Sequence, residues 1–200
     1  MDNKKRRQAP MRCKSAFFFL VCLLDRGRFI SPKGNCFVIG MFRKFEAPLM
    51  NESHLLFFNP ADAGNLGSIL RTAVGFGIRN VALIKPAVDV FDPKTIRASM
   101  GALFQINFEY FDDIDSYRQK FINNSLYAFM LDAQTPLHLT KFVKPYTLVF
   151  GNEASVLPVE YASFCETVVI PHSHEIDSLN LTIAVSIAMY TTTISDWGKT

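Results

Sequence analysis

Short apolar runs alternate with segments of helical periodicity from residue 54 onward. The apolar runs predict six strands, at residues 54–58, 81–84, 104–108, 126–131, 147–150 and 168–170. Helical spacing predicts four helices, at residues 66–76, 92–100, 114–121 and 179–192. Apolar strands that alternate with helices are typical of a parallel sheet that is buried on both faces. The pattern therefore predicts an α/β fold with a mainly parallel sheet flanked by helices.

Local signals define the ends of the predicted helices. In the first helix, Leu66, Ile69, Leu70 and Ala73 fall on one face, and the glycines at 75 and 77 end it. The last helix is expected to be capped by Asp177 or Ser178, because short polar side chains accept hydrogen bonds from the free N–H groups of a first turn. The strand, helix and strand of residues 54–84 predict two parallel neighbours.

Three polar loops follow predicted strands, at residues 59–71, 150–158 and 170–180. In open α/β sheets, ligands bind outside the carboxyl ends of the strands. We therefore expect these loops to converge at one edge of the sheet and to form the functional site there.

Several well-known signatures are missing from the sequence. It contains no GxxxxGK[ST], no GxGxxG after a strand and no GxSxG, which argues against a P-loop, a dinucleotide fold and an α/β-hydrolase. There is no CxxC motif, and no Cys/His cluster has zinc-ligand spacing. His172 and His174 flank Ser173 without further ligands nearby, so the sequence predicts no metal site.

Charge divides the chain into two parts, although the net charge is only +3. Residues 1–46 contain 11 Lys and Arg against 3 acids, a net +8, whereas residues 47–200 contain 10 against 15, a net −5. We predict a basic N-terminal arm at 1–46, either disordered or a truncated RNA-binding region. The second domain is predicted at 47–200.

The arm contains an apolar run at residues 16–24 after a basic start, like the centre of a signal peptide. The run is shorter than the roughly 20 residues that a membrane span needs, and no small-x-small cleavage site follows it. Three alternatives are open: a strand or helix of the body, a remnant of a shortened N-terminal region, or a true start nearer Met41 or Met50. No membrane association is predicted.

Cysteine usage favours a reducing compartment. The four cysteines form no framework across the body, because three lie in the arm; they are Cys13, Cys22, Cys36 and Cys165. Free thiols are typical of the cytosol, so a cytoplasmic location is expected.

The polar loops contain three motifs in a fixed order. The first, in GNLGSILRTAVGFG, has Asn65, Gly67 and Arg71. The second is Gly-x-Glu after a strand, in LVFGNEASVLP, and the third is IPHSHEIDSLN before an apolar helix. Together with RASMGALF at 97–104, these motifs resemble the SpoU-type tRNA/rRNA 2′-O-ribose methyltransferases of the SPOUT superfamily. The resemblance covers roughly residues 55–190, and the stretch 61–63 makes the first loop longer than the usual form.

The resemblance implies a C-terminal deep trefoil knot that binds S-adenosylmethionine. By motif position, the backbone groups that bind this cofactor belong to Gly151, Ile170 and Leu179. Glycine lets the main chain approach a ligand closely, and apolar side chains shelter an adenine. The alternative for Ile170 and Leu179 is an ordinary core position.

The resemblance also implies the catalytic residues. Arg71 lies at the reaction centre, where it either acts through an RNA phosphate or holds that phosphate while another group takes the proton; the alternative is a surface salt bridge. Asn65 orients the arginine and the ribose, or caps the helix. Glu153 holds the first loop or the arginine, or is a solvated acid. Ser178 and Asn180 form hydrogen bonds across the site, or act as caps.

The implied activity is transfer of a methyl group to a ribose 2′-hydroxyl of tRNA or rRNA by a homodimer with sites at the subunit interface, formed by the first and last helices. The alternatives are a catalytically inactive RNA-binding or assembly factor on the same fold and, more remotely, an unrelated nucleotide-binding protein. RNA contacts are expected from the arm or from a local basic patch. The candidates for that patch are Arg71, Arg79, Lys85, Arg97, Lys141 and Lys144.

Overall fold

The structure is a computed structural model that describes residues 19–21, 39–152 and 157–196. The chain divides into two units, residues 1–45 and 46–200. In the first unit, β1 (Phe19–Val21) pairs antiparallel with β2 (Ile39–Met41). β1 therefore does not belong to the sheet of the body, and that alternative for the apolar run is wrong for these three residues. The role of the arm stays a prediction.

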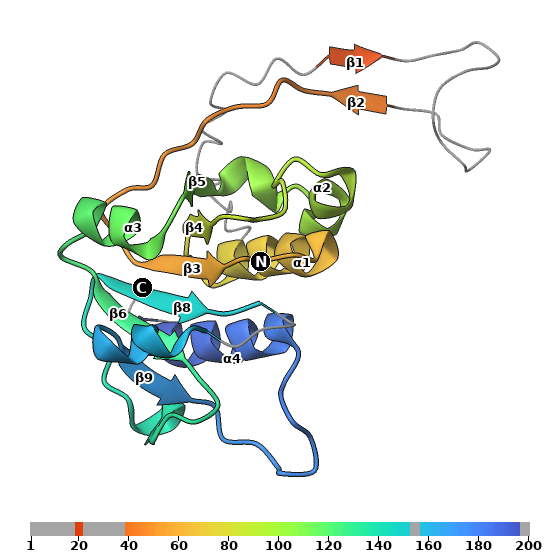
Figure 1. The fold of residues 1–200 in the computed structure, drawn as a ribbon. Helices are drawn as coiled ribbons and strands as arrows, with labels where there is room; N and C mark the ends of the chain where they lie inside the picture. Colours follow the sequence, from red (N-terminus) through yellow and green to blue (C-terminus); the bar gives the residue numbers. More distant parts are fainter. Residues whose placement is uncertain (1–18, 22–38, 153–156, 197–200) are drawn as a thin grey trace, which may run out of the picture. The chain divides into compact units, whose positions relative to one another are not determined.

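The second unit is built on one seven-stranded sheet (Figure 1). Its strand order is β5-β4-β3-β8-β6-β9-β7, and each neighbouring pair is parallel. The strands are β3 (His54–Phe58), β4 (Asn80–Ile84), β5 (Asn107–Phe111), β6 (Ser125–Phe129), β7 (Thr135–Pro136), β8 (Tyr146–Phe150) and β9 (Glu166–Val169). The predicted α/β fold with a parallel sheet is confirmed, while the knot stays a prediction.

The four predicted helices are present. They are α1 (Ala63–Gly75), α2 (Pro93–Ser99), α3 (Ile114–Lys120) and α4 (Leu181–Thr193). Short 3-10 turns, which periodicity did not predict, are Ala102–Gln105, Leu137–Leu139, Val159–Ser163 and Ile194–Asp196. No helix in the described part of the chain is long and apolar enough to cross a membrane.

One predicted strand begins three residues later in the structure than the sequence predicts. The apolar run at 104–108 was expected to be a strand, but Ala102–Gln105 is a 3-10 turn and β5 begins at Asn107. Met100 and Gly101 both have positive φ, so the chain turns sharply after α2 and buries Leu103 before it extends. A short apolar run cannot distinguish a buried turn from a buried strand.

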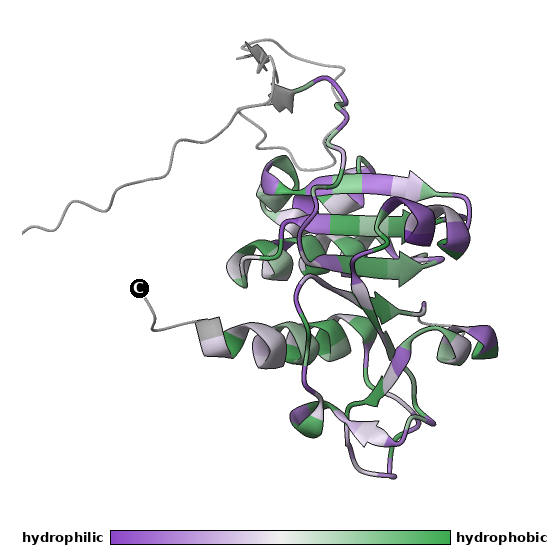
Figure 2. Cartoon of the chain, turned by 90° about the vertical axis from the view of Figure 1, so that its left-hand side faces the viewer, coloured by the Kyte–Doolittle hydropathy of each residue, from purple (hydrophilic) through white to green (hydrophobic). Residues whose placement is uncertain are grey.

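Both faces of the sheet are covered, as the apolar strands predict. Leu56, Ala82 and Val149 lie in register on one face, in a core that includes Tyr117 and Phe121 at α3. Among the helices, α1 packs against both α2 and α4. Figure 2 shows the hydrophobic colour running along the central strands. Every residue of β4 and of β8 is buried, so side chains on both faces of these strands are removed from water.

A buried polar network closes the amino-terminal edge of the sheet. His54 Nε2 lies 2.7 Å from the carbonyl oxygen of Met50, and His54 Nδ1 lies 2.7 Å from Tyr117 Oη. Tyr117 Oη lies 2.6 Å from Thr147 Oγ1, to which Asn124 Nδ2 donates at 3.1 Å. Because a carbonyl only accepts, Nε2 carries the proton. In the neutral ring, Nδ1 then accepts from the Tyr117 hydroxyl.

Burial lowers the pKa of His54, although the Met50 carbonyl and the charges of Glu52 and Glu109 oppose this shift. In the unfolded chain a histidine has a pKa of about 6.5. Below that pH the unfolded state binds a proton that the folded state does not bind. The free energy of unfolding is therefore expected to fall, by up to about 1.4 kcal/mol per pH unit, until the folded-state pKa is passed.

The measurement is urea denaturation between pH 7.5 and 5 of the wild type and of His54→Gln. The variant is expected to be less stable at pH 7.5 and to lose less stability as the pH falls, because it cannot bind this proton. Parallel stability curves for the two proteins would contradict the assignment.

Candidate functional site

The carboxyl ends of the parallel strands meet at one edge of the sheet. β3, β4 and β5 extend to one side, and β8, β6, β9 and β7 to the other, so the strand order reverses between β3 and β8. Such a reversal leaves a crevice in which open α/β proteins bind ligands. The three polar loops follow β3, β8 and β9, and because these strands are parallel the loops leave the sheet at the same edge, as predicted.

A pocket of about 290 Å³ lies at this edge. Its apolar wall includes Phe129 and Phe150, whose rings stack with their centroids 4.5 Å apart. The other lining residues are Met130, Leu131, Gly151, Asn152, Val168, Ile170, His172, Ser178, Leu179, Leu181 and Ala184. The pocket thus combines aromatic and aliphatic walls with a few polar groups, which is typical of small-molecule sites.

Four of the predicted site residues line this pocket together. They are Gly151 from the second loop, and Ile170, Ser178 and Leu179 from the third. Ile170 and Leu179 are only partly buried, so the alternative that they are ordinary core residues does not describe them. Contact of these residues with a cofactor stays a prediction.

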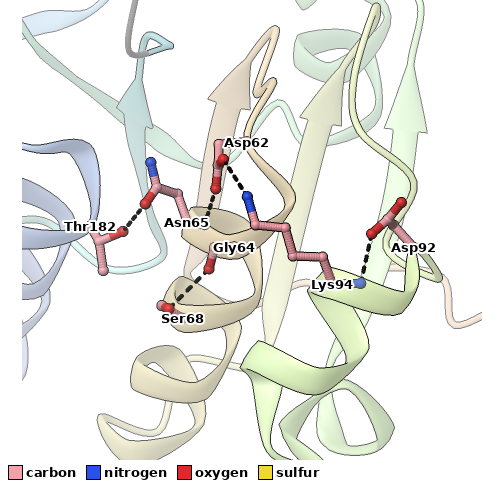
Figure 3. Close-up of polar contacts among 7 residues, drawn as sticks. All are labelled: Asp62, Gly64, Asn65, Ser68, Asp92, Lys94 and Thr182. Atoms are coloured by element: carbon pink, nitrogen blue, oxygen red, sulfur yellow. Dashed lines mark hydrogen bonds and ion pairs between the residues drawn. The ribbon is translucent and has the colours of Figure 1, made fainter. Parts of the chain in front are cut away.

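A side-chain contact joins the first loop to the first turn of α4, which directly follows the third loop. Asn65 Oδ1 accepts a hydrogen bond from Thr182 Oγ1 at 3.3 Å (Figure 3). α1 begins at Ala63 and its cap is Asp62, whose Oδ1 accepts from the N–H of Asn65 at 2.7 Å. The alternative that Asn65 caps the helix is therefore wrong, since Asn65 lies inside the first turn.

The cap of α4 also differs from the prediction. Asn180 Oδ1 accepts from the N–H of Thr182 at 2.9 Å, and the helix begins at Leu181. Asp177 and Ser178 are not the cap, because the backbone of Asn180 is still non-helical, with φ −55° and ψ 139°, and Leu179 before it lines the pocket. Asn180 thus caps α4, which is the alternative role expected from the sequence. Its hydrogen bonding across the site stays a prediction.

Arg71 lies on α1 six residues after Asn65, about 9 Å further along the helix axis. Its side chain is exposed and is not among the residues that line the pocket. Among the described residues its guanidinium forms no ion pair, so the surface salt bridge is not supported there. Glu153, the remaining predicted site residue, lies outside the described residues.

Sequence reasoning missed part of the pocket wall. His172 lines it, with Nδ1 2.8 Å from the carbonyl oxygen of Ile170, whereas the sequence indicates only an exposed loop histidine. The described residues contain no group of three or more His, Cys, Asp or Glu that could hold a metal ion. Asn152 lies inside the second motif and could have been chosen from it. Phe129 ends β6, which carries no motif, so no signal in the sequence indicated it.

The fold and the pocket together define an α/β protein with a ligand-sized pocket at the carboxyl ends of β6, β8 and β9. The model of the SpoU rRNA Methylase family matches residues 52–190, and the chain belongs to that family. The resemblance inferred from the three motifs is therefore confirmed.

Relatives support the same family. The chain is 30% identical over 139 residues to an uncharacterized tRNA/rRNA methyltransferase of Synechocystis sp., which covers 68% of this chain and 51% of that protein. It is 30% identical over 144 residues to a 23S rRNA (uridine(2479)-2′-O)-methyltransferase of Streptomyces viridochromogenes, with 68% and 50% covered. The chain thus spans about half the length of these curated relatives.

Among solved structures, the AdoMet-bound rRNA methyltransferase from Sinorhizobium meliloti has a TM-score of 0.75 and 30% identity. The match covers 82% of this chain and 66% of that chain. The fold class predicted from the sequence is therefore also found in a solved relative.

Proposed function

We propose that this protein transfers a methyl group from S-adenosylmethionine to a ribose 2′-hydroxyl of tRNA or rRNA. The observation that carries the proposal is the pocket at the carboxyl ends of β6, β8 and β9, which is lined by Gly151 of one motif and by Ile170 and Leu179 of another. The relatives named above support it, since one is a 2′-O-methyltransferase of rRNA and one was solved with AdoMet bound.

The residues of the pocket fit this cofactor. An adenosine ring needs a flat apolar surface, which the stacked Phe129 and Phe150 and the neighbouring aliphatic side chains offer. Its polar groups need hydrogen-bond partners, which the backbone at Gly151 and the side chains of Asn152 and Ser178 can supply. Both requirements are met by one pocket.

When bound, S-adenosylmethionine would supply an electrophilic methyl group on its sulfonium sulfur, and Gly151, Ile170 and Leu179 would hold the cofactor in the pocket. The protein's contribution is mainly to align the two reactants. Arg71 keeps its positive charge and presents a planar fork, so it is suited to hold an RNA phosphate. Asn65 and Asn180, linked through Thr182, orient the groups at the rim of the site.

The active form is proposed to be a homodimer. α4 and the turn after it expose an apolar stripe at helical spacing, formed by Ile183, Ile187, Tyr190 and Ile194. Tyr190 also contacts Phe76 at the end of α1, with ring centroids 6.2 Å apart, so the two helices present one continuous surface. Because Arg71 is exposed and does not line its own pocket, a second subunit docked here can complete the site.

The stripe makes the dimer testable. Ile183→Asp is expected to shift the protein from dimer to monomer and to abolish methyl transfer, because a buried unpaired charge is costly at an interface. Sedimentation velocity measures the first effect and a transfer assay the second. The matched control is Ile122→Asp, which introduces the same charge at an isoleucine that is 82% exposed outside the stripe. A wild-type monomer, or an Ile183→Asp variant that remains dimeric, would contradict this interface.

RNA is proposed to contact the exposed side chains of Arg71 and Arg97, together with the basic arm. Lys85 is less suited to contact RNA, since its Nζ lies 2.8 Å from Asp112 Oδ1.

The proposed location is the cytoplasm, supported by the free, buried thiol of Cys165.

Two measurements test the proposed function. Calorimetric titration with S-adenosylmethionine is expected to show binding, and no binding would overturn the assignment. Mass spectrometric mapping of ribose methylation in a deletion strain is expected to show the loss of a methyl group from one nucleotide. If no nucleotide loses its methyl group and the purified protein transfers none to bulk tRNA or rRNA, the inactive RNA-binding factor becomes the better description.

A further inference from the structure

An ion pair connects two helices beside the site. Lys94 Nζ, in the first turn of α2, lies 2.8 Å from Asp62 Oδ2 (Figure 3). Asp62 is the N-cap of α1, and its other oxygen accepts from the N–H of Asn65 at 2.7 Å. One carboxylate therefore joins the start of α2 to the start of α1, at the first asparagine of the motifs.

The connection continues to α4. Asn65 Oδ1 accepts from Thr182 Oγ1, and the N–H of Thr182 donates to Asn180 Oδ1. The ion pair of Lys94 and Asp62 is thus the first contact in a series of polar contacts that ends at α4. Two predicted catalytic residues, Asn65 and Asn180, belong to this series. A shift of the cap would move the backbone of Asn65 and change its contact with α4.

The aliphatic part of the Lys94 side chain lies close to Gly64 in the first turn of α1. A Cβ added to Gly64 would lie 2.9 Å from Lys94 Cε and 3.0 Å from Asp62 Oδ1, so a side chain there would displace the end of the lysine from the carboxylate. The hydrogen bond from Lys94, followed by the N–H of Asn65, lowers the pKa of the Asp62 carboxyl. The carboxylate is therefore held in its charged form between two donors.

Stability alone does not explain this arrangement. The side chains of Lys94 and Asp62 are 57% and 43% exposed, and ion pairs so open to water contribute little to folding. Asp62 also lies in the stretch 61–63, which, by the resemblance to the SpoU-type family, makes the first loop longer than the usual form. A longer loop has more freedom, and a contact that fixes its last residue restores a defined position for Asn65.

We propose that Asp62 and Lys94 are positioning residues that hold Asn65 for methyl transfer. This inference rests on the proposed function. The two residues act through the first turn of α1, and they contact neither the cofactor nor the RNA.

Asp62→Asn and Lys94→Met test this role. Asparagine keeps a capping oxygen and loses the charge, while methionine keeps the stem over Gly64 and loses the ammonium. Each variant is expected to lower kcat about tenfold, because a small misplacement of an aligning group slows the reaction. KM for RNA should remain within about twofold, and the double variant should be no slower than either single variant. Lys94→Arg should recover most of the rate.

Direct binding of RNA by Lys94 predicts a different pattern. Lys94→Met would then raise KM for RNA, and Asp62→Asn would lower it by removing a negative charge. That pattern overturns the positioning role. The matched control is Lys120→Met, which breaks an ion pair with Glu109 on α3 and β5 and should leave kcat unchanged.

Hydrogen exchange of the Asn65 amide separates this inference from the proposed function. Exchange is expected to be faster in Asp62→Asn and Lys94→Met than in the wild type and Lys120→Met. Unchanged exchange overturns the positioning role whatever the activity, and faster exchange with an unchanged kcat overturns it as well. If the wild type transfers no methyl group to any RNA, the proposed function falls, and faster exchange still supports Asp62 and Lys94 as the pair that holds Asn65.

Discussion

Arg71→Ala is expected to lower kcat for methyl transfer about 10³-fold, while the fold, the dimer and the affinity for S-adenosylmethionine remain those of the wild type. The side chain is exposed and forms no ion pair with the described residues, so its removal breaks no contact that stabilises the domain. It also does not line the pocket, so the cofactor should still bind. Single-turnover transfer, calorimetry and thermal denaturation measure the three quantities.

Two further variants show what the arginine contributes. Arg71→Lys keeps the charge but loses the planar fork, so it should recover little activity if two hydrogen bonds to a phosphate are needed. Arg118→Ala is the matched control. Arg118 lies on α3, where its guanidinium pairs with Asp115 and lies 4.3 Å from the centre of the Phe164 ring. It should keep the wild-type rate. An active Arg71→Ala variant would show that the reaction centre lies elsewhere.

Much of the fold could be predicted because its strands are buried on both faces. A run such as residues 54–58 is apolar on both sides, and β3 has those same bounds. The run at 104–108 also reads as a strand, but its first two residues end a 3-10 turn and only its last two belong to β5, because the positive φ of Met100 and Gly101 redirects the chain. Backbone conformation of this kind depends on tertiary contacts and is not visible in periodicity.

The pocket could be predicted only where a motif marks it. Gly151, Ile170 and Leu179 come from such motifs, and the structure places them around one cavity. Phe129 completes the wall from β6, which has an ordinary strand sequence, so only the strand order reveals its position. The caps show a related difficulty. Asp62 and Asn65 are both good capping residues, and the start of the helix decides between them.

Gly67 illustrates how the structure gives a physical reason for a motif residue. A Cβ added there would lie 2.5 Å from the carbonyl oxygen of Thr95, 2.6 Å from Ala98 Cβ and 3.0 Å from the amide nitrogen of Ser99. Two of these atoms belong to the backbone of α2, which cannot move without shifting the helix. Glycine at position 67 therefore allows α1 and α2 to pack closely, and that packing brings Lys94 to Asp62.

Gly67→Ala is accordingly expected to destabilise the domain by about 2 kcal/mol, since forced overpacking outweighs the higher helix propensity of alanine. Gly75→Ala is the matched control in the same helix, where an added Cβ meets nothing within 4 Å, and it should stabilise the domain by about 0.5–1 kcal/mol. Urea denaturation measures both changes. Because separation of the helices would also move Lys94, Gly67→Ala should speed exchange of the Asn65 amide, whereas Gly75→Ala should not. Equal effects of the two substitutions on stability would show that the contact between α1 and α2 is looser than these distances indicate.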